Sequence, residues 1–450
     1  MANTFPDNWN KLTPEQKLDW RLAAWAAIEG KPLNTPQAVA NFTAATRRYI
    51  DVLKLREPDR VPRTLILGDY VAHYAGSNPG EFFYDYPKAI EATIKFCKDF
   101  DLDYGAGGNF MPGKLFDRLG YRLYRWPGGA LAPTQGFQFV EGEYMTADEY
   151  DALIADPESF AMRVYTPRVM GALGGLGMVP SFFGTVELPF VPFMLAGFSA
   201  PPTHEAFKAL LEANQIVLEW FGANAQLGAV TLGEMGLPGT MGGFSKAPFD
   251  YLGDSLRGTR GIMMDMYRRP AKVLAAVERL VPMAIQMGVG AANGSGTPFA
   301  MLPLHKGADG FMSNADFKKF YWPTLKATIE GIAQEGVVPM MFVEGGYNQR
   351  LDIIAESGLP KAATMWIFDQ TDMAQAKAKF GSWACIGGNV PASLFKAGTP
   401  EQISDYVKKL VDTCAPGGGF FLSPGAVLDQ AKAENVHAYL KTAKELGVYR

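Results

Sequence analysis

The sequence predicts an α/β protein that folds as a (β/α)8 barrel, and three observations support this prediction. From residue 338 to the end, short apolar segments alternate regularly with helical patterns. These segments end in a polar residue or a glycine turn, which is how a parallel α/β sheet presents chemical groups. Roughly eight such segments occur along the chain, as a barrel requires. An open doubly wound sheet is the competing topology, but neither GxGxxG after a first strand nor GxxxxGK[ST] is present.

The composition fits a large soluble protein and disfavours several classes. With 450 residues, 48% of them hydrophobic, the chain can bury one large core or two ordinary ones. The net charge of −4 is dispersed, so no basic nucleic-acid surface or polybasic membrane anchor is visible. The first residues lack the apolar core of a signal peptide, and no run of about eighteen apolar residues suggests a membrane span. A cytoplasmic location is expected.

Cysteine and histidine are scarce. Cys97, Cys385 and Cys414 lie far apart without any CxxC pair or cysteine–histidine cluster, so neither a disulfide framework nor a thiolate zinc site is indicated. Of the four histidines, His204 and His437 lie on predicted amphipathic helices, where surface positions are expected.

Residues 1–60 are predicted to form a helical extension before the barrel of residues 61–450. Thr13-Pro14 and Thr35-Pro36 each combine an N-cap residue with proline at the first helical position. The segment 64–68 then predicts the first strand, which ends at Asp69.

The middle of the chain is less regular. The elements predicted there are a helix over 86–100, a strand over 102–108 that ends near Asn109, a β-excursion over 121–145, helices over 147–153 and 157–171, a strand over 179–183 and a long helix over 204–221. Residues 222–260 are rich in glycine and proline but retain aromatic and aliphatic residues. They are predicted to be an ordered insertion in the barrel.

The last third predicts a regular alternation of strands and helices. Arg269-Pro270 precedes a helix over 271–287, and Ser313 caps a helix that extends to about residue 335. The predicted strands are 299–304, 338–343, 363–368, 384–387 and 419–422, and the helices between and after the last four are 348–357, 372–379, 400–413 and 429–446.

Polar residues at the predicted strand ends are the candidates for chemistry. They are Asp69, His305, Glu344, Asp369 and Asn389. A carboxylate and an imidazole that converge over a barrel mouth can perform acid–base catalysis or hold a metal ion. Glu344 and His305 are the only candidates for metal ligands, and the same strand-end residues can instead cap helices and close turns.

Two further pairs of residues have alternative interpretations. His73 lies four residues after Asp69, so the two side chains can face one pocket or form a surface pair. Arg257 and Arg260 can clamp an anionic group, or they can pair internally with Asp250, Asp254 or Asp265, all three of which lie nearby in the sequence.

From about residue 60 onward the chain resembles the uroporphyrinogen decarboxylase superfamily. The motifs that carry the resemblance are Val179–Gly184 leading to Pro189-Phe190, Gly310–Ser313 with Tyr321-Trp322-Pro323, Gly388-Asn389-Val390-Pro391 followed by Gly398-Thr399-Pro400-Glu401, and Gly418–Gly425 followed by Glu434-Asn435-Val436. The resemblance implies a (β/α)8 barrel.

The sequence departs from both main chemistries of that superfamily. True decarboxylases hold substrate carboxylates with arginines after the first strand, where this chain has Leu67-Gly68-Asp69-Tyr70. The zinc ligands of the corrinoid-linked methyltransferases align with Phe342, Glu344 and Ala426, so a thiolate zinc site is not supported. Related members pass a methyl group from a methyl ether to cobalamin on a partner protein, for which an acid at the leaving oxygen is enough.

The resemblance therefore implies a methyltransferase component that acts with a corrinoid protein on a small, mainly apolar or aromatic methyl donor. Glu344 and His305 are expected to be catalytic, with Asp69 and His73 orienting the substrate. Asn109, Arg257, Arg260, Asp369 and Asn389 are expected to bind it. The alternative is a decarboxylase or lyase with a changed substrate, in which Arg257 and Arg260 replace the missing clamp. A barrel without catalysis, serving as a binding subunit, is a third interpretation, and a homo-oligomer is expected by default.

Overall fold

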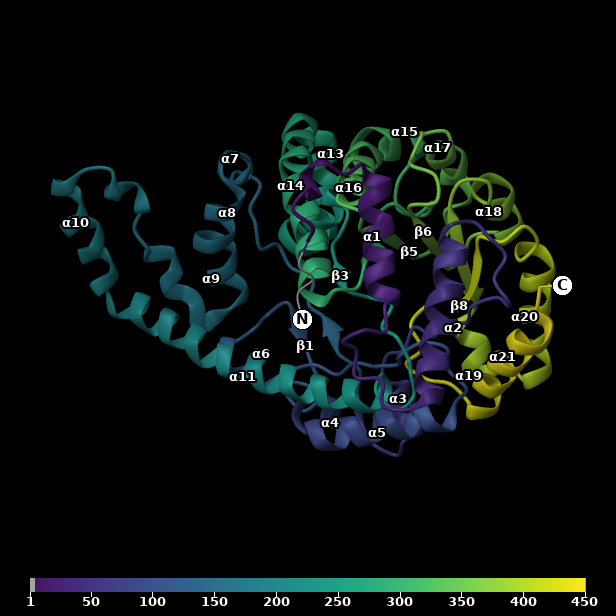
Figure 1. The fold of residues 1–450 in the computed structure, drawn as a ribbon. Helices are drawn as coiled ribbons and strands as arrows, with labels where there is room; N and C mark the ends of the chain where they lie inside the picture. The colour runs from purple at the N-terminus through teal and green to yellow at the C-terminus, as the bar shows by residue number, and fades with distance from the viewer. Residues whose placement is uncertain (1–4, 450) are drawn as a thin grey trace.

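A computed structural model describes residues 5–449 and contains a six-stranded parallel sheet of order β3-β4-β5-β6-β7-β8 (Figure 1). The strands are β3 Gly243–Phe244, β4 Phe299–Leu304, β5 Val338–Val343, β6 Met365–Phe368, β7 Cys385–Val390 and β8 Phe420–Pro424. Every neighbouring pair is parallel and in sequence order. The α/β class and the parallel sheet that were predicted are thus confirmed.

Helices follow the strands on the outside of the sheet. They are α14 Pro270–Ser295, α15 Asn314–Asp316 with α16 Trp322–Gln334, α17 Leu351–Ala355, α18 Met373–Phe380, α19 Ala392–Ala397 with α20 Pro400–Cys414, and α21 Ala433–Leu446. The predicted caps are present, since Ser313 accepts a hydrogen bond from the Asp316 N–H and Thr399 forms a capping box with Gln402. The alternation predicted from residue 299 onward is confirmed.

Residues 61–67 lie beside β8. Arg63 and Leu67 make isolated parallel bridges with Leu422 and Leu428, and the Thr64 N–H donates to the Leu422 carbonyl at 2.8 Å. The predicted strand 64–68 is therefore paired, although only through separate bridges. The predicted strand 102–108 is irregular. Its one backbone hydrogen bond to a distant part of the described chain runs from the Gly105 N–H to the Pro238 carbonyl (3.0 Å). Closure of the sheet into a barrel stays a prediction.

Two predictions in the middle of the chain are wrong. Residues 179–183 form no strand: Ser181 caps a 3-10 turn over Phe182–Thr185, and Pro180 has no N–H to give to a sheet. Residues 222–260 are not an insertion, because β3 lies within them. A short apolar run does not reveal whether a neighbouring strand exists, so periodicity could not decide either case.

The segment that does project from the body is an arm of residues 166–231. It contains α9 Thr166–Val169, α10 Val191–Ala196 and the long helix α11 Pro201–Thr231, and Figure 1 shows α10 and the start of α11 extending away from the sheet. Ala206, Ala209 and Ala213 of α11 pack on Leu173 and Leu176. The predicted long helix is confirmed, and it is longer than predicted.

Between the first helices and the arm the chain is largely helical. Its elements are α3 Tyr70–Tyr74, α4 Pro79–Tyr84, α5 Tyr86–Asp99, α6 Gly113–Leu119, the antiparallel pair β1 Tyr124–Arg125 and β2 Gln138–Phe139, α7 Tyr150–Ala155 and α8 Pro157–Phe160. The predicted helix over 86–100 and the β-excursion over 121–145 are confirmed, the latter as a single two-residue pair.

The first two helices pack into the end of the sheet where the strands begin. They are α1 Pro14–Ala26 and α2 Pro36–Leu53, with the predicted Thr13 and Thr35 caps. Trp25 and Tyr49 contact Phe299 of β4, in a core that also contains residues of β5 to β8. The helices were predicted as an extension, and their packing makes them part of the sheet's core.

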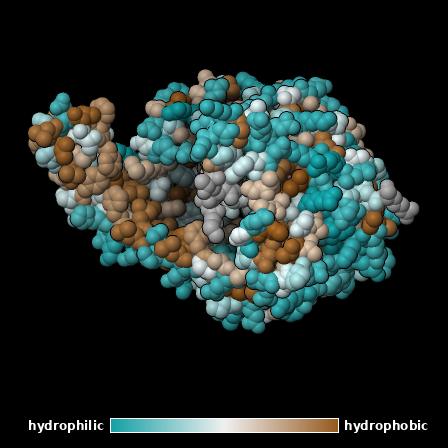
Figure 2. All heavy atoms as spheres, viewed as in Figure 1, coloured by the Kyte–Doolittle hydropathy of each residue, from teal (hydrophilic) through white to brown (hydrophobic). Residues whose placement is uncertain are grey.

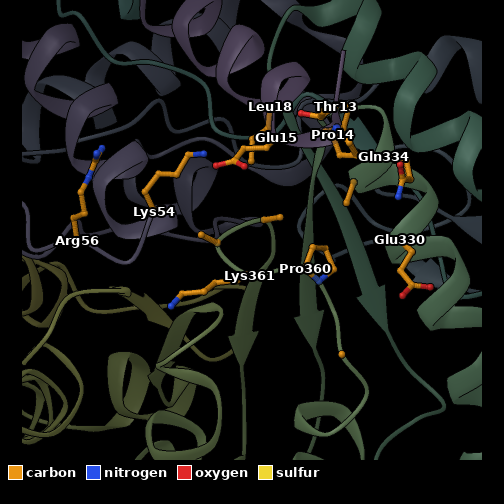
Figure 3. A pocket seen from close by; sticks show the side chains of 16 residues that line it. Thr13, Pro14, Glu15, Leu18, Lys54, Arg56, Glu330, Gln334, Pro360 and Lys361 are labelled. Atoms are coloured by element: carbon orange, nitrogen blue, oxygen red, sulfur yellow. The ribbon is translucent and has the colours of Figure 1, made fainter. Parts of the chain in front are cut away.

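A hollow of about 1150 Å³ lies at this same end. Figure 3 shows Arg56 and Lys54 at the left of the hollow, Lys361 below them, and Gln334 and Glu330 at the right. Because Val337 and Ala363 line it just before β5 and β6 begin, the hollow lies opposite the carboxyl ends of the strands. Parallel α/β proteins carry their chemistry at those carboxyl ends, so the catalytic site is expected elsewhere.

Helix α14 is the one described helix whose length and composition would allow it to cross a membrane. Its Val273, Ala276, Val277 and Ala284 are buried in the core, and it packs on α16 and β4. One such helix is weak evidence for a membrane span, and one face of this helix packs on the core.

Candidate functional site

The predicted polar residues do lie at the carboxyl ends of neighbouring strands. His305 follows β4, Glu344 follows β5, Asp369 follows β6, and Asn389 is the fifth residue of β7. Since β4 to β7 are parallel neighbours, these ends form one edge of the sheet. Their catalytic and binding roles stay predictions, and their surroundings indicate what each can do.

His305 is hydrogen-bonded to a carboxylate from a distant part of the chain. Its Nδ1 lies 2.6 Å from Oδ2 of Asp254. Asp254 lies in a π-helical turn, Tyr251–Leu256, and such turns are frequent at functional sites. The His305 side chain is 34% exposed and that of Asp254 is 9% exposed. His305 is thus anchored on its inner side and open on the other.

Asp254 is surrounded by positive charge. Nζ of Lys306 lies 3.0 Å from its Oδ1, and Nζ of Lys246 donates to its Oδ2. Lys306 also donates to Oγ1 of Thr259 at 2.9 Å. The carboxylate therefore keeps two cationic partners even when the imidazole is neutral.

A second buried carboxylate, Asp250, holds the loop that carries His305. Its Oδ2 accepts hydrogen bonds from the His305 N–H at 3.1 Å and the Tyr321 hydroxyl at 2.7 Å, and its Oδ1 accepts one from the Lys306 N–H at 3.0 Å. Burial, together with the charge of Asp254, raises the pKa of Asp250. These bonds fix the backbone from which the imidazole projects.

The electrostatics keep His305 protonated. Burial by itself lowers the pKa of His305, but the hydrogen bond to Asp254 and the nearby carboxylates of Glu344 and Asp250 outweigh burial and raise this pKa to about 10. Burial likewise raises the pKa of Asp254, but His305 and Lys246 outweigh it and hold that pKa well below its ordinary value. At neutral pH the pair is an imidazolium and a carboxylate.

Glu344 lies on the open side of the imidazolium. Its Oε1 is 3.6 Å from Nε2 of His305, and its side chain is 46% exposed. This distance makes an ion-pair contact without a hydrogen bond. The Nε2 proton is therefore available to a ligand that enters between the two side chains.

Replacing Asp254 with asparagine is expected to bring the pKa of His305 down toward its ordinary value of about 6.5. The wild-type imidazolium persists as the pH rises toward about 10, whereas the variant's imidazole will lose its proton near neutral pH. An NMR titration of the ring protons measures this change, with Asp405→Asn, an exposed residue of α20, as the control. An unchanged titration in Asp254→Asn would contradict the pairing.

The same pair also affects stability. Because the folded-state pKa of His305 lies above that of the unfolded chain, its stabilising contribution is fully present below about pH 6.5. This contribution is lost as the pH rises through about 10.

Asp69 belongs to a separate cluster. Nδ2 of Asn109 donates to its Oδ1 at 2.7 Å, and Oδ1 of Asp429 accepts from its backbone N–H at 3.0 Å. Burial raises the pKa of Asp69, and Asp429 adds to this effect while Asn109 opposes it. The structure thus brings Asp69 and Asn109 together, whereas His73 is exposed one helical turn further on.

Asp369 and Asn389 border a cavity of about 600 Å³ at the ends of β6 and β7. Burial raises the pKa of Asp369, and the charge of Glu344 adds to this effect. Nδ2 of Asn389 donates to the backbone carbonyls of Asp369 and Thr371, both at 2.8 Å. The predicted substrate-binding role therefore fits Asp369 better than Asn389, whose amide nitrogen already holds the strand ends together.

The two predicted arginines differ in their surroundings. Arg257 is buried, donates to Asp265 at 2.7 Å and pairs with Glu143. Arg260 is exposed. Arg257 is thus paired internally, which was the alternative interpretation from the sequence. Of the two arginines, only Arg260 remains available to bind an anionic group of a substrate.

The residues present do not fit a thiolate zinc site. Phe342 is buried in the core, and Ala426 has no donor atom in its side chain. Within residues 5–449, no three His, Cys, Asp or Glu side chains are grouped so that they could hold one metal ion.

Sequence reasoning did not assign Asp254, Asp250, Lys246 or Lys306 to this site. Asp250 and Asp254 were considered only as possible ion-pair partners of Arg257 and Arg260. Their spacing of four residues places both on one side of a helical turn, which is the signal that the sequence offers. Their use by His305, 51 residues later, depends on the tertiary structure.

Comparisons with known proteins agree with this architecture. Residues 199–446 match a family model described as uroporphyrinogen decarboxylase (URO-D). Among solved structures 51 chains match, including a methyltransferase from Methanosarcina mazei with 15% identity and a TM-score of 0.56. That match covers 90% of this chain and 99% of the other. At this identity it shows a shared fold. No curated protein sequence matches the chain significantly.

Proposed function

Because the chain belongs to the uroporphyrinogen decarboxylase family, we propose that it is a methyltransferase component that moves a methyl group from a small, mainly aromatic methyl ether to a corrinoid protein. The single observation that carries this proposal is the Asp254–His305 pair, which holds a protonated imidazole at the edge of the sheet with Nε2 open to a ligand. The shared fold with a methyltransferase adds support.

The methyl–oxygen bond breaks and its electron pair stays on oxygen, which takes the proton from Nε2 of His305. The reduced corrinoid on the partner protein supplies the electron pair that accepts the methyl group. The products are the free hydroxyl compound and the methylated corrinoid, and His305 regains a proton from solvent, with Glu344 as the carboxylate beside Nε2.

The acidity of His305 favours an aromatic leaving group. A phenol such as tyrosine has a pKa of about 10, close to that of the His305 imidazolium. Proton transfer to a departing phenolate is then nearly balanced in energy, and the acid is fully protonated at neutral pH.

The decarboxylase alternative loses support from the structure. Its substrates carry carboxylates that need free arginines, and Arg257 is committed to Asp265. Arg60 and Arg63, near the first predicted strand, both pair with Asp103. A methyl ether needs no such clamp.

We also infer that the sheet closes into a (β/α)8 barrel. Residues 61–67 extend the sheet beyond β8, and the hydrogen bond from Gly105 to Pro238 brings residues 102–108 beside the chain that leads to β3. These contacts support a ring in which Asp69 and His305 share one mouth.

Visible spectroscopy tests the activity. The protein is mixed with a corrinoid protein reduced to cobalt(I), and a series of aryl methyl ethers is added. Appearance of the methyl-cobalt spectrum establishes methyl transfer and identifies the donor. No change across a broad donor panel, with folded protein and reduced corrinoid, would overturn the proposal.

Glu344→Gln is expected to slow methyl transfer about 100-fold, the lower end of the usual range for acid–base groups. The amide cannot relay a proton to His305, while the fold is retained because the side chain is half-exposed. Steady-state turnover rates measure the effect, because reprotonation of His305 follows each methyl transfer, with Glu356→Gln, an exposed residue beside α17, as the matched control. Full activity in Glu344→Gln would remove Glu344 from the mechanism.

A further inference from the structure

The arm of residues 166–231 carries an unusual amount of exposed apolar surface. Thirteen large apolar side chains between residues 178 and 221 are exposed, including Leu188, which is 87% exposed. Figure 2 shows hydrophobic residues over the tip of the arm and along its length, on the left. Six of these side chains are phenylalanines, and since an aromatic side chain offers about 150–250 Å², the arm exposes on the order of 1,000 Å² of apolar surface. The largest patch on a typical monomer is about 300–600 Å².

Part of this surface is an ordered stripe on α11. Residues 207, 211, 214, 218, 221 and 225 are all exposed and are spaced alternately by four and three positions. Leu211 is 71% exposed and Leu218 54% exposed. This 4-3 spacing is the seam with which one helix packs on another, and the stripe contains one polar residue, Asn214.

The stripe is distinct from the face with which α11 packs on its own chain. That buried face consists of small residues such as Ala206, Ala209 and Ala213, and the stripe lies roughly 120° away from it around the helix. Its own chain covers one face of α11 and leaves the second apolar stripe exposed, so this stripe still lacks a surface to pack against.

We propose that this stripe and the arm tip form the interface of a symmetric dimer, in which α11 of one copy packs antiparallel against α11 of the second. A closed two-fold interface needs a patch that complements itself. In the antiparallel arrangement centred on residue 216, Phe207 faces Ala225, Leu211 faces Phe221, and Asn214 faces Leu218. At the ends of the seam a large side chain thus meets a small one.

Each copy also offers a site for the tip of the other arm. An apolar hollow of about 790 Å³ lies between α14 and the residues just before the arm, lined by Phe160, Tyr165, Leu280 and Met283 among others. Antiparallel pairing brings each tip toward the base of the partner's arm. The exposed apolar area matches the roughly 800 Å² per partner of a stable interface.

Charge argues against a membrane as the occupant. Between Val169 and Phe207 the chain contains no lysine or arginine, and its charged residues there are Glu187 and Glu205. The polar face of α11 carries Glu205, Glu212 and Glu219 against Lys208. Helices that lie on membranes carry basic residues on the polar face, because these attract anionic lipids.

Sedimentation equilibrium over a range of concentrations tests the dimer. The wild-type chain is expected to be dimeric, and Leu218→Lys to raise the dissociation constant at least 100-fold. The matched control, Gln215→Lys, places the same charge on the polar face of α11 and should leave the dimer intact. Circular dichroism checks that both variants retain their helices. A monomeric wild type, or a Leu218→Lys dimer as tight as wild type, would overturn the proposal.

A cross-link tests the antiparallel arrangement. The native cysteines are buried, so mixing Asn214→Cys chains with Leu218→Cys chains and oxidising them should give a linked dimer. A dimer without this link would overturn the antiparallel pairing. Flotation with vesicles of neutral or anionic lipid provides the remaining test, since a monomeric wild type that floats would assign the arm to a membrane surface.

Discussion

His305→Gln is expected to reduce methyl transfer by about 10²- to 10⁴-fold, the range for loss of a general acid. Glutamine retains a hydrogen-bonding side chain of similar reach but cannot give up a proton at neutral pH. The variant should fold, because Asp254 keeps Lys246 and Lys306 as partners and the His305 side chain is already one-third exposed.

The measurement is the single-turnover rate of methyl transfer at saturating methyl ether. His204→Gln is the matched control, since His204 is exposed on α11 and makes the same chemical change away from the site. Donors with more acidic leaving groups should be affected less, because they need less assistance from an acid. A rate within threefold of wild type would remove His305 as the acid.

The second large effect is expected on stability. Asp103 is buried and pairs most closely with two arginines, Arg60 and Arg63, of which Arg63 is fully buried; a third, Arg48, lies 3.8 Å away. Asp103→Asn keeps the shape of the side chain but removes the buried counter-ion of both arginines and leaves Arg63 only the exposed Asp101, 3.2 Å away. Removing one partner of a buried pair typically costs about 3–5 kcal/mol. The urea midpoint at pH 7 should fall accordingly. Asp19→Asn, which breaks the exposed pair with Lys54, should cost less than about 1 kcal/mol.

The same carboxylate makes the stability of the protein sensitive to acid. Burial raises the pKa of Asp103, but Arg60 and Arg63 outweigh burial and hold it at about 2, below the roughly 3.9 of an unfolded chain. Its contribution is therefore present above about pH 4 and is lost as the pH falls toward 2. In Asp103→Asn this part of the acid dependence should be missing. Equal acid dependence in wild type and variant would contradict the assignment.

Much of the sheet could be predicted because its signals are local. A strand buried on both faces is a continuous apolar run, as in residues 338–343, and helix caps such as Ser313 and Thr399 mark where helices begin. Prediction failed where the decisive feature was not local. Residues 179–183 are as apolar as a strand, but they lie in an arm with no neighbouring strand to pair with.

Some residues of the candidate site could likewise be predicted from local sequence signals, and others could not. His305, Glu344 and Asp369 could be found from the sequence, because each directly follows an apolar run that ends a strand. Asp254 could not be assigned to His305, because 51 residues separate the two. The sequence suggested Arg257 as a substrate-binding residue. Its partner in the structure, Asp265, was one of three nearby aspartates proposed as internal ion-pair partners.

Local sequence signals are enough to identify the family, the alternation of strands and helices from residue 299 onward and the polar residues at the strand ends, because each depends on a few neighbouring residues. The folded structure was needed to show that Asp254 holds His305 as an imidazolium, that Arg257 pairs with Asp265, and that the apolar residues of the arm are exposed. These outcomes depend on burial and on distances between charges that are remote in sequence, and both exist only once the chain has folded.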